Sequence, residues 1–294
     1  MTVAHPASPT DLFERERRHL VGLAYRMLGT VADAEDVVQE AWLRWQAVPE
    51  GSIERPAAWL NTVTTRLALD HLRAARRRRE SYVGPWLPEP VVTDVGPAET
   101  AELAESLRLG FLAVLDELKP VERAVFLLAD VFDVPFTEIA ATVDKSEAAC
   151  RQIAHRARGK VTRPHAPRDA RAEREVVDSL LVAIASGDTD RVLACVAPDV
   201  VCVSDGGPDR RAARRPVVGS HRVARLVINL ARRYAGAISV EAIEVNGDFG
   251  VVLSIDGEVD QLMTFEVERE RVVRILIVRN PDKLARLARP PAID

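Results

Sequence analysis

The hydrophobic periodicity of the chain changes near residue 165, and this change limits the folds that the chain can adopt. Upstream, apolar residues recur at the three- and four-residue spacing of amphipathic helices. Downstream, helical segments are followed by strand-like runs separated by the turn sequences NGD, DG and ERE, as in hairpins. The sequence therefore predicts a multidomain protein with an all-α N-terminal half and an α+β C-terminal half built on an antiparallel sheet. The four strand-like runs are 237–245, 249–256, 259–267 and 271–279.

Three amphipathic helices are expected in the first eighty residues. The first spans 11–30 and the second 31–48, each with an apolar stripe on one side. The third begins at Pro56, a residue favoured in the first turn of a helix, and runs to about residue 79. We expect these helices to form one domain over residues 8–80.

Two segments have the composition of linkers. Residues 81–105 are rich in proline and glycine, and the second linker, 164–172, coincides with the sequence RPHAPRDAR (163–171) over most of its length. Trp86 and Leu87 are unusual for a solvated tether, which predicts that part of the first linker is docked on another element. The C-terminal α+β domain is expected over residues 173–294.

The region between the linkers, 106–163, has the pattern of a helix-turn-helix domain. Helical periodicity over 98–118 is followed by a helix from Pro120 to about Val131. A short helix (135–143), a tight turn and a longer helix opened by Ser146 come next, and Ser146 is a favourable N-cap. This order of elements is typical of domains that insert their second helix into the DNA major groove.

The bulk composition excludes several classes of protein. The 294 residues are 47% hydrophobic and carry a net charge of −4, so any nucleic-acid signal must come from local clusters. Three scattered cysteines are too few for a disulfide framework or a zinc site. The N-terminus lacks the apolar core of a signal peptide, and no apolar run is long enough to cross a bilayer. We therefore expect a cytoplasmic protein with no membrane association, no cofactor and no metal.

The helix 31–48 carries an acidic face. DNA phosphates would repel this face, whereas a basic protein surface would attract it. The sequence therefore predicts a protein-binding surface on this helix. Its residues are Asp33, Glu35, Asp36, Gln39 and Glu40.

The helix 56–79 is basic and ends in a cluster of arginines. Arginine neutralises phosphates, and asparagine and threonine can contact base edges, so this helix is a candidate DNA-binding element. An arginine run at a helix C-terminus can equally be a solvated face that complements the helix dipole. The candidate DNA-binding residues are Asn61, Thr62, Thr65, Arg66, Arg73, Arg76 and Arg77.

The helix opened by Ser146 is a stronger candidate. Arg151, His155 and Arg158 recur on one face. The residues Ala149, Ile153 and Ala157 recur on another face and are expected to pack inward. A basic face on the second helix of a helix-turn-helix favours binding in the major groove. The candidate residues are Ser146, Glu147, Arg151, Gln152, His155, Arg156, Arg158 and Lys160.

The first 163 residues resemble bacterial sigma factors of the extracytoplasmic-function group. The resemblance is carried by AYRMLGTVADAEDVVQEAWLRW, RPAAWLNTVTTRLALDHLR and LDELKPVERAVFLLADVFDVPFTEIAATVDKSEAACRQIAHRAR, which match sigma regions 2 and 4 in the right order. It implies that the acidic helix binds core RNA polymerase, and that the loop 46–55 and the helix 56–73 read and help open the minus-10 promoter element. It also implies that the Ser146 helix reads the minus-35 element. Core polymerase and promoter DNA are the partners implied.

The C-terminal tail resembles SnoaL-like domains, whose fold is a cone of helices and curved sheet. The sequences WLPEP (86–90), SDGG (204–207) and NPDKL (280–284) are similar to those of a sigma subgroup in which such a domain is fused in cis. That resemblance implies that the tail modulates sigma activity. We hypothesise that the tail packs across both sigma regions and fixes their separation until polymerase or a ligand shifts the population. The residues assigned to this contact are Trp86, Asp205, Asp282 and Lys283.

Two rival interpretations remain open from the sequence. One is a ligand-sensing helix-turn-helix regulator, which would not need the acidic helix. The other is a SnoaL-type isomerase or cyclase with a DNA-binding appendage, but its candidate acids and bases show no convincing inward-pointing pair, and fold analogy does not transfer chemistry. We therefore expect no enzymatic activity. We also expect a chain that is monomeric when free, with an unidentified small molecule as a possible ligand of the SnoaL-like domain. The candidate acids and bases are Asp199, Asp205, His221 and Asp256.

Overall fold

The computed structural model describes residues 9–49, 51–79, 81–92, 106–161, 169–233 and 238–287. The chain divides into two compact units, each with its own core. The first unit comprises Met1–Glu80 and Val114–Thr162, and the second comprises Ser81–Ala113 and Arg163–Asp294. Both the helical half and the α+β half predicted from the sequence are present, which confirms the fold class.

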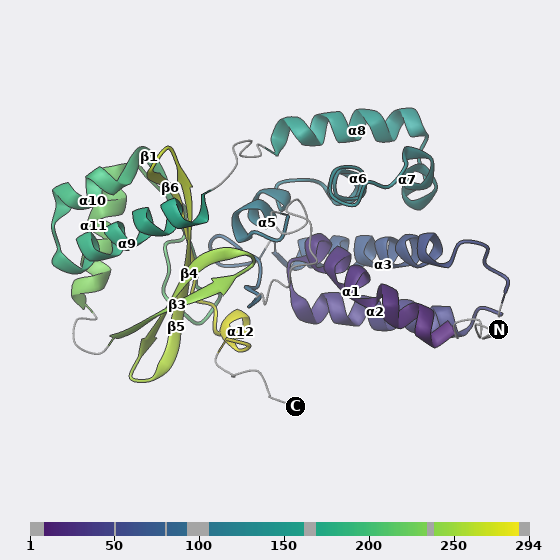
Figure 1. The fold of residues 1–294 in the computed structure, drawn as a ribbon, viewed down its shortest axis with the longest axis horizontal. Coiled ribbons are helices and arrows are strands. Elements are labelled where there is room, and N and C mark those ends of the chain that lie inside the picture. Colours follow the sequence, from purple (N-terminus) through teal and green to yellow (C-terminus); the bar gives the residue numbers. More distant parts are fainter. Residues whose placement is uncertain are drawn as a thin grey trace, which may run out of the picture. The chain divides into compact units, whose positions relative to one another are not determined.

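The first three helices pack side by side in the first unit (Figure 1). They are α1 (Pro9–Leu28), α2 (Val31–Gln46) and α3 (Pro56–Arg79), within about two residues of the predicted bounds. Their apolar stripes face one another, so residues such as Leu23, Val37 and Leu60 are excluded from solvent. Gly29 adopts a positive φ of 78°, which lets the chain reverse between α1 and α2.

The helix-turn-helix is present in the same unit. Its elements in this unit are α6 (Pro120–Asp130), α7 (Phe136–Val143) and α8 (Glu147–Lys160). The helix before them, α5 (Leu109–Leu115), belongs to the second unit as far as Ala113. Asp144 ends α7 in the left-handed conformation, and the Ser146 side chain accepts a hydrogen bond from Ala149 N, as expected of an N-cap. The helix predicted over 98–118 is shorter than expected, because 106–108 are not helical; 98–105 lie outside the described residues.

A buried arginine joins the helix-turn-helix helices to the first three helices. Arg123 of α6 donates from Nε to Arg26 O of α1 at 3.0 Å, and its Nη1 lies 3.3 Å from Asp116 Oδ1. Burial lowers the pKa of Arg123 to about 10, and the charge of Asp116 acts in the opposite direction. The contact with Arg26 O therefore links the two helical groups, and Asp116, which also pairs with Arg79 of α3, adds an ion pair between them.

Over its described residues, the second unit contains one six-stranded sheet and four helices besides the greater part of α5. Its strands follow the spatial order β2-β1-β6-β5-β4-β3. The helices are α9 (Ala170–Ser186), α10 (Thr189–Cys195), α11 (Ser220–Arg233) and α12 (Pro281–Leu284). The strands are β1 (Val196–Asp205), β2 (Val217–Val218), β3 (Ile238–Val245), β4 (Asp248–Ile255), β5 (Glu258–Glu268) and β6 (Arg271–Val278).

One strand pair departs from the expected antiparallel sheet. β1 pairs with β6 in parallel, whereas β3, β4, β5 and β6 pair in antiparallel succession. The four C-terminal strands are joined by tight turns, which force antiparallel pairing. The chain passes from β1 to β6 through α11 and four further strands, β2 to β5, a connection long enough to allow the parallel arrangement.

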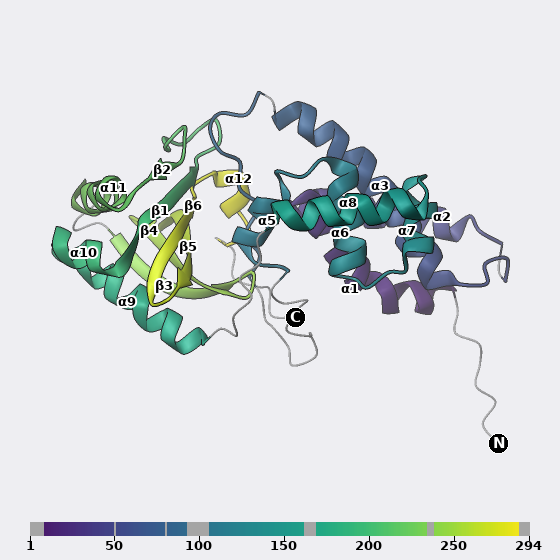
Figure 2. The ribbon, with the colours of Figure 1, turned by 90° about the horizontal axis from the view of Figure 1, so that it is seen from above.

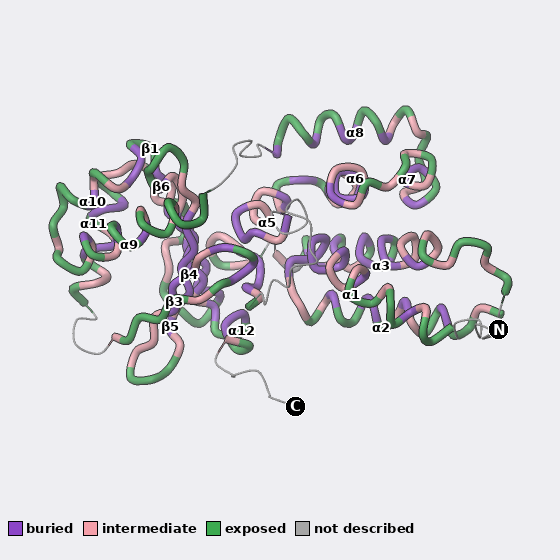
Figure 3. The backbone as a smooth tube through the Cα atoms, in the orientation of Figure 1, coloured by how far each residue is buried: buried purple, intermediate pink, exposed green. Residues whose placement is uncertain are grey.

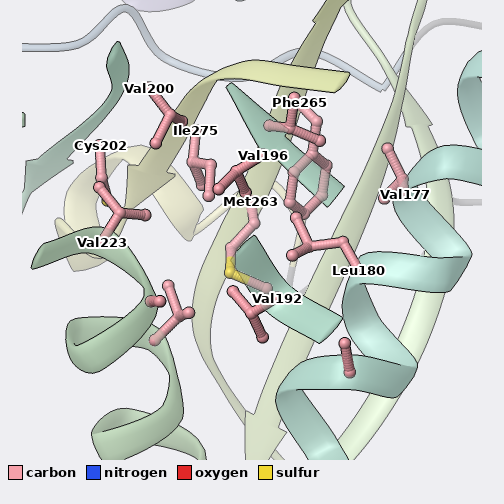
Figure 4. Close-up of a cluster of buried hydrophobic side chains, with 14 of the residues drawn as sticks. Val177, Leu180, Val192, Val196, Val200, Cys202, Val223, Met263, Phe265 and Ile275 are labelled. Carbon is pink, nitrogen blue, oxygen red and sulfur yellow. The ribbon is translucent and has the colours of Figure 1, made fainter. Parts of the chain in front are cut away.

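A hydrophobic core lies on each face of the sheet. On one face, side chains such as Met263 and Phe265 point toward Val192 and Leu180 of the helices that cover the sheet (Figure 4). Figure 2 shows α9, α10 and α11 on this side and α12 on the other. The opposite face forms a second core with residues from outside the α+β half. Those residues are Leu87 and Leu109, which pack with Leu284 of α12 and with Val245, Val252, Leu262, Leu276 and Val278.

The segment predicted as a linker, 81–105, is therefore part of the second unit over its described residues. Leu87 is 2% exposed and packs on the sheet, as the prediction of partial docking required. Residues 93–105, and 162–168 of the second predicted linker, lie outside the described residues. Cys150 and Cys202 are buried and Cys195 is half-buried, and all three are unpaired thiols. Within the described ranges, no helix combines the length and apolar character needed to cross a bilayer.

We expect Leu87→Ala to lower the free energy of unfolding of the second unit by about 2–4 kcal/mol, because it leaves a cavity under the sheet. Val83→Ala is the matched control, since Val83 belongs to the same segment but is 48% exposed. Urea denaturation of the full chain, followed by circular dichroism, measures both. Equal stabilities of the two variants would contradict the docking of this segment.

Candidate protein-binding and nucleic-acid-binding surfaces

The acidic face of α2 is accessible to solvent. Glu35, Asp36 and Gln39 are exposed and Asp33 and Glu40 are half-buried, while Val37 and Val38 point into the core. Thr30 Oγ1 donates to Asp33 Oδ2 at 2.5 Å, which orients that carboxylate at the start of the helix. The predicted residues thus share one helix surface.

The same surface carries an apolar residue that sequence reasoning missed. Leu43 is 57% exposed and lies one turn beyond Gln39 and Glu40. Glu40 forms an ion pair with Arg44 at 2.6 Å, so Arg44 partly neutralises this end of the face. A leucine on the polar side of an amphipathic helix was the available sequence signal, and it is the residue type expected to anchor a protein contact.

The candidate minus-10 face of α3 is in contact with α7, the first helix of the helix-turn-helix. Arg66 donates from Nη2 to Ala141 O at 2.7 Å and from Nε to Thr142 O at 3.1 Å. The hydroxyls of Thr62 and Thr142 are 3.2 Å apart. Arg55, in the loop before α3, forms an ion pair with Glu138 at 2.7 Å. These contacts engage Thr62 and Arg66 of the predicted DNA-binding set, although the Arg66 side chain remains exposed.

The remaining predicted residues of α3 differ in their surroundings. Asn61 contacts His19 Nε2 at 2.9 Å, and Arg76 donates to Leu118 O at 3.0 Å. Arg73 forms an exposed ion pair with Asp70, and Arg77 is exposed. The expectation that Thr65 is exposed is wrong. It is fully buried on the inner side of the helix, because it lies next to Thr64 on the core-facing turn.

The basic face of α8 is exposed along the helix, as Figure 3 shows. Ile153 and Ala157 are buried, as predicted from their spacing. Three basic side chains are held by nearby carboxylates: Arg151 by Glu147 at 2.9 Å, Arg158 by Asp130 at 2.8 Å and Lys160 by Glu122 at 2.8 Å. The exposed predicted residues are Ser146, Arg151, Gln152, His155, Arg156, Arg158 and Lys160, whereas Glu147 is half-buried.

A cluster around Asp205 fixes the start of the 81–92 segment to the end of β1 and to α12. The carboxylate of Asp205 accepts hydrogen bonds from the Tyr82 hydroxyl at 2.6 Å and from Leu87 N at 2.8 Å. Lys283 Nζ lies 2.6 Å from the same carboxylate, and Asn280 Nδ2 donates to the Tyr82 oxygen at 2.9 Å. We refer to these five residues as the Asp205 anchor.

Burial governs the chemistry of the Asp205 anchor. Asp205 and Lys283 are both buried, and Lys283 also donates to Leu87 O at 2.5 Å. The ammonium of Lys283 lies 4.2 Å from the centre of the Trp86 ring, in cation–π geometry. Burial, followed by the hydrogen bond to Asp205, raises the pKa of Tyr82 well above its ordinary range, so the hydroxyl stays protonated and can donate.

Three of the four residues predicted for interdomain contact therefore lie together, and the fourth does not join them. Trp86, Asp205 and Lys283 meet in the second unit. Asp282 is exposed in the first turn of α12, where its backbone N–H donates a hydrogen bond to Asn280 Oδ1. This is the position of an acid that complements a helix N-terminus.

A second attachment point was not expected from the sequence. Asn246, in the β3–β4 turn, accepts a hydrogen bond from Val91 N at 2.9 Å and donates to Leu107 O at 2.9 Å. Asp248 forms a buried ion pair with Arg108 at 2.6 Å. Burial raises the pKa of Asp248 to about 7, with Arg108 acting in the opposite direction. We call these five residues the Asn246 anchor; the NGD sequence indicated a turn but not its partners.

The residues considered for catalysis lie in ordinary structural positions. Asp256 occupies the β4–β5 turn with a φ of 51°, and Asp199 is exposed in β1. His221 is exposed in the first turn of α11, and Asp205 is engaged in the ion pair with Lys283. Groups of histidine, cysteine and carboxylate side chains able to hold a metal do not occur among the described residues.

Comparisons with known proteins give consistent results over both halves of the chain. Residues 12–78 match the Sigma-70 region 2 family, and residues 108–161 match Sigma-70, region 4. The chain is 42% identical over 286 residues to the ECF RNA polymerase sigma factor SigJ of Mycobacterium tuberculosis, covering 92% of this chain and 91% of the relative. A probable ECF sigma factor, SigI of the same species, is 33% identical over 273 residues, covering 91% and 92% of the two chains.

A solved structure agrees with this similarity. The crystal structure of the M. tuberculosis extracytoplasmic function sigma factor SigJ superposes with a TM-score of 0.76 at 40% sequence identity. The match covers 94% of this chain and 98% of the SigJ chain, so it includes the α+β unit as well as the helices.

We expect Lys283→Met to lower the free energy of unfolding by about 3–5 kcal/mol, because it leaves the carboxylate of Asp205 buried without a cation. The double variant Asp205→Asn with Lys283→Met should lose less free energy of unfolding than the sum of the losses in the single variants Asp205→Asn and Lys283→Met. The control Asp282→Asn removes a neighbouring but exposed charge and should cost less than about 1 kcal/mol. Denaturant unfolding of the four proteins measures these differences, and a Lys283→Met variant as stable as Asp282→Asn would contradict the buried pair.

Proposed function

Because this chain belongs to the extracytoplasmic-function RNA polymerase sigma factors, we propose that it directs core RNA polymerase to promoters through three separate surfaces. The acidic face of α2 would bind core polymerase, and α3 and α8 would bind the two promoter elements. The second unit would modulate these activities in cis. In this proposal the chain acts in the cytoplasm, where transcription takes place.

The single observation that carries the proposal is the exposed acidic face of α2 on a helix whose opposite side is buried. A conventional DNA-binding repressor has no use for such a face, whereas a polymerase-binding protein needs one. Leu43 would supply apolar contact at the end of this face, and Asp36 and Gln39 would supply charge and hydrogen bonds. Charge complementarity of this kind speeds association and selects the partner.

We expect the triple variant Asp33→Asn, Asp36→Asn and Glu40→Gln to bind core RNA polymerase at least about tenfold more weakly, since each lost carboxylate removes a favourable charge contact. Fluorescence anisotropy of the labelled chain titrated with core enzyme measures the affinity. The control is a triple variant of exposed acids in the second unit: Asp178→Asn, Asp190→Asn and Glu241→Gln.

Unchanged affinity in the α2 variant would refute the proposed polymerase surface. A wild-type chain that does not bind core enzyme at all would favour a conventional DNA-binding regulator instead. Leu43→Ala provides an independent probe of the same surface, and we expect it to weaken binding without changing its dependence on salt.

The contacts within the first unit support a proposal about promoter binding. Arg66 and Thr62, on the face of α3 assigned to the minus-10 element, are bonded to α7. A guanidinium whose donors are directed to backbone carbonyls cannot contact a phosphate with the same donors. We therefore propose that α7 must leave α3 before α3 binds promoter DNA. The basic face of α8, which is exposed, would be available at once.

The two anchors support a role for the second unit in this separation. The chain between α3 and α6 is attached to the second unit through the Asp205 anchor and the Asn246 anchor. Residues 81–108 could reach about 90 Å if fully extended, at roughly 3.3 Å per residue. Anchoring removes most of that reach. Because the two promoter elements lie tens of ångströms apart, we propose that the second unit keeps the DNA-binding helices from spreading until the anchors release.

We expect Trp86→Ala and Lys283→Met to change promoter-dependent run-off transcription several-fold relative to wild type, because each weakens the Asp205 anchor. The template is promoter DNA recovered by pull-down with core enzyme and the wild-type chain. Val83→Ala is the control, since Val83 is exposed in the same segment. Transcription at wild-type level from both anchor variants would refute regulation through this anchor while leaving the polymerase-binding proposal intact.

A further inference from the structure

A cavity of about 360 Å³, which we call the chamber, lies between helices α9 and α11 and the sheet face that they cover. Its volume falls within the range of small-molecule sites, roughly 300–1,000 Å³. Two polar residues, Arg232 and Gln261, contribute to its described lining. The apolar lining includes Leu181, Val227, Val251, Met263, Phe265 and Ile277.

A second cavity, of about 450 Å³, adjoins the chamber and has the opposite character. We call it the arginine mouth, because four arginines line it against a single acid, Asp209. The two cavities share Leu230, Gln261 and Ile277, so Gln261 stands where apolar lining gives way to basic lining. The four arginines are Arg210, Arg211, Arg233 and Arg279.

The arginine mouth retains positive charge after its internal ion pairs are considered. Arg279 bonds both oxygens of Asp260, at 2.9 and 2.8 Å, and Arg210 lies 3.7 Å from the same carboxylate. Arg211 and Arg233 are exposed, and the described residues offer neither of them an ion-pair partner. One carboxylate therefore serves two of the four cations.

An unsatisfied donor adds a second, independent observation. The Nε of Arg279 is buried and has no hydrogen-bond partner among the described residues. A buried donor without a partner costs about 1–3 kcal/mol, so such atoms are rare unless a ligand or water satisfies them. The residue that carries this unsatisfied donor, Arg279, is part of the lining of the arginine mouth.

We propose that the chamber and the arginine mouth together bind an amphipathic monocarboxylic acid. Its apolar body occupies the chamber, and its carboxylate reaches the arginine mouth past Gln261. The planar guanidinium matches a carboxylate, and charge-assisted hydrogen bonds are the stronger ones. A cationic head is repelled by the same arginines. The described chamber lining holds no carboxylate, histidine or cysteine, which favours binding of this ligand over its chemical conversion.

The arginine mouth is bonded to the segment that carries the Asp205 anchor. Arg279 Nη1 donates to Arg211 O at 2.7 Å, and the backbone N–H groups of Arg279 and Asn280 donate to Asp205 O at 2.7 and 3.1 Å. The Asp205 side chain in turn holds Leu87 N. A ligand that fixes Arg279 and Arg211 would therefore stabilise the anchor. This consequence rests on the proposed regulatory role, whereas ligand binding itself does not.

The experiment is calorimetric titration of the full chain with three ligands that share an octyl body: octanoate, 1-octanol and octyltrimethylammonium. We expect octanoate to saturate one site at least about tenfold more tightly than octanol, and the cation to bind more weakly than octanol. Equal affinities for octanoate and octanol would overturn the proposed head group. Absence of saturable octanoate binding would overturn the site.

Variants locate the two parts of the site. Gln261→Glu places a carboxylate between the cavities and should abolish the preference for octanoate over octanol. The double variant Arg211→Gln with Arg233→Gln changes exposed side chains and should weaken octanoate binding about tenfold without affecting octanol. Ala231→Trp fills the chamber and should weaken both ligands. Arg191→Gln, an exposed arginine of α10 outside both linings, is the control and should bind as wild type.

Octanoate affinity that is unchanged in the double arginine variant would overturn the assignment of the arginine mouth, whatever the other variants do. Hydrogen exchange at the Leu87 amide tests the link to the anchor, and we expect octanoate to slow it several-fold. Unaltered exchange in a saturated sample would overturn that link. These measurements need neither polymerase nor promoter, so their failure is distinguishable from failure of the proposed sigma function.

Discussion

The buried ion pair between Asp205 and Lys283 is the interaction on which the second unit depends. A carboxylate and an ammonium lose several kcal/mol each on leaving water, and their mutual attraction offsets this only if the remaining polar atoms are satisfied. The Asp205 carboxylate also accepts hydrogen bonds from the Tyr82 hydroxyl, Leu87 N and Gly207 N. Three distant segments of chain therefore meet at one charge: the stretch after α3, the end of β1 and the start of α12.

This arrangement gives the second face of the sheet its cover. Helices α9 to α11 occupy one face, and the opposite face would expose Leu262, Leu276 and Val278 without Leu87 and Leu109. The chain between the two DNA-binding regions is thus also a structural part of the α+β unit. Because the buried pair and the apolar contact lie side by side, releasing this segment requires losing both at once. Such coupling makes the attachment behave as a switch with two states.

The first unit has a corresponding arrangement, in which side chains that we propose bind DNA make internal contacts. Arg66 donates to two carbonyls of α7, and Arg76 donates to Leu118 O. These are surface hydrogen bonds, each worth little in net free energy, and DNA phosphates offer the same donors a charged acceptor. This difference in acceptor strength is the physical basis of our proposal that promoter DNA displaces α7 from α3.

Local patterns were enough to predict most elements of this fold. The helix bounds of α1 to α3, the helix-turn-helix with its Ser146 cap, and the four C-terminal strands follow from periodicity and turn chemistry. The exposed faces of α2 and α8 also followed, because helical spacing alone decides which residues share a side. Thr65 was misplaced for the same reason: the 3.6-residue period leaves the boundary between faces uncertain by one position.

The sequence by itself determined which segments are helices or strands, which helix faces are acidic or basic, and where the helical half ends. Tertiary structure alone decided that β1 pairs in parallel with β6. It also decided that Asn246 and Asp248 bind the chain near Val91 and Arg108. The cavity in which apolar lining meets four arginines is likewise a product of the tertiary structure. The physical reason is the separation of the interacting residues along the sequence. Propensity and periodicity depend on near neighbours, whereas these contacts join residues far apart along the chain. Their partners are chosen by packing, which no local pattern encodes.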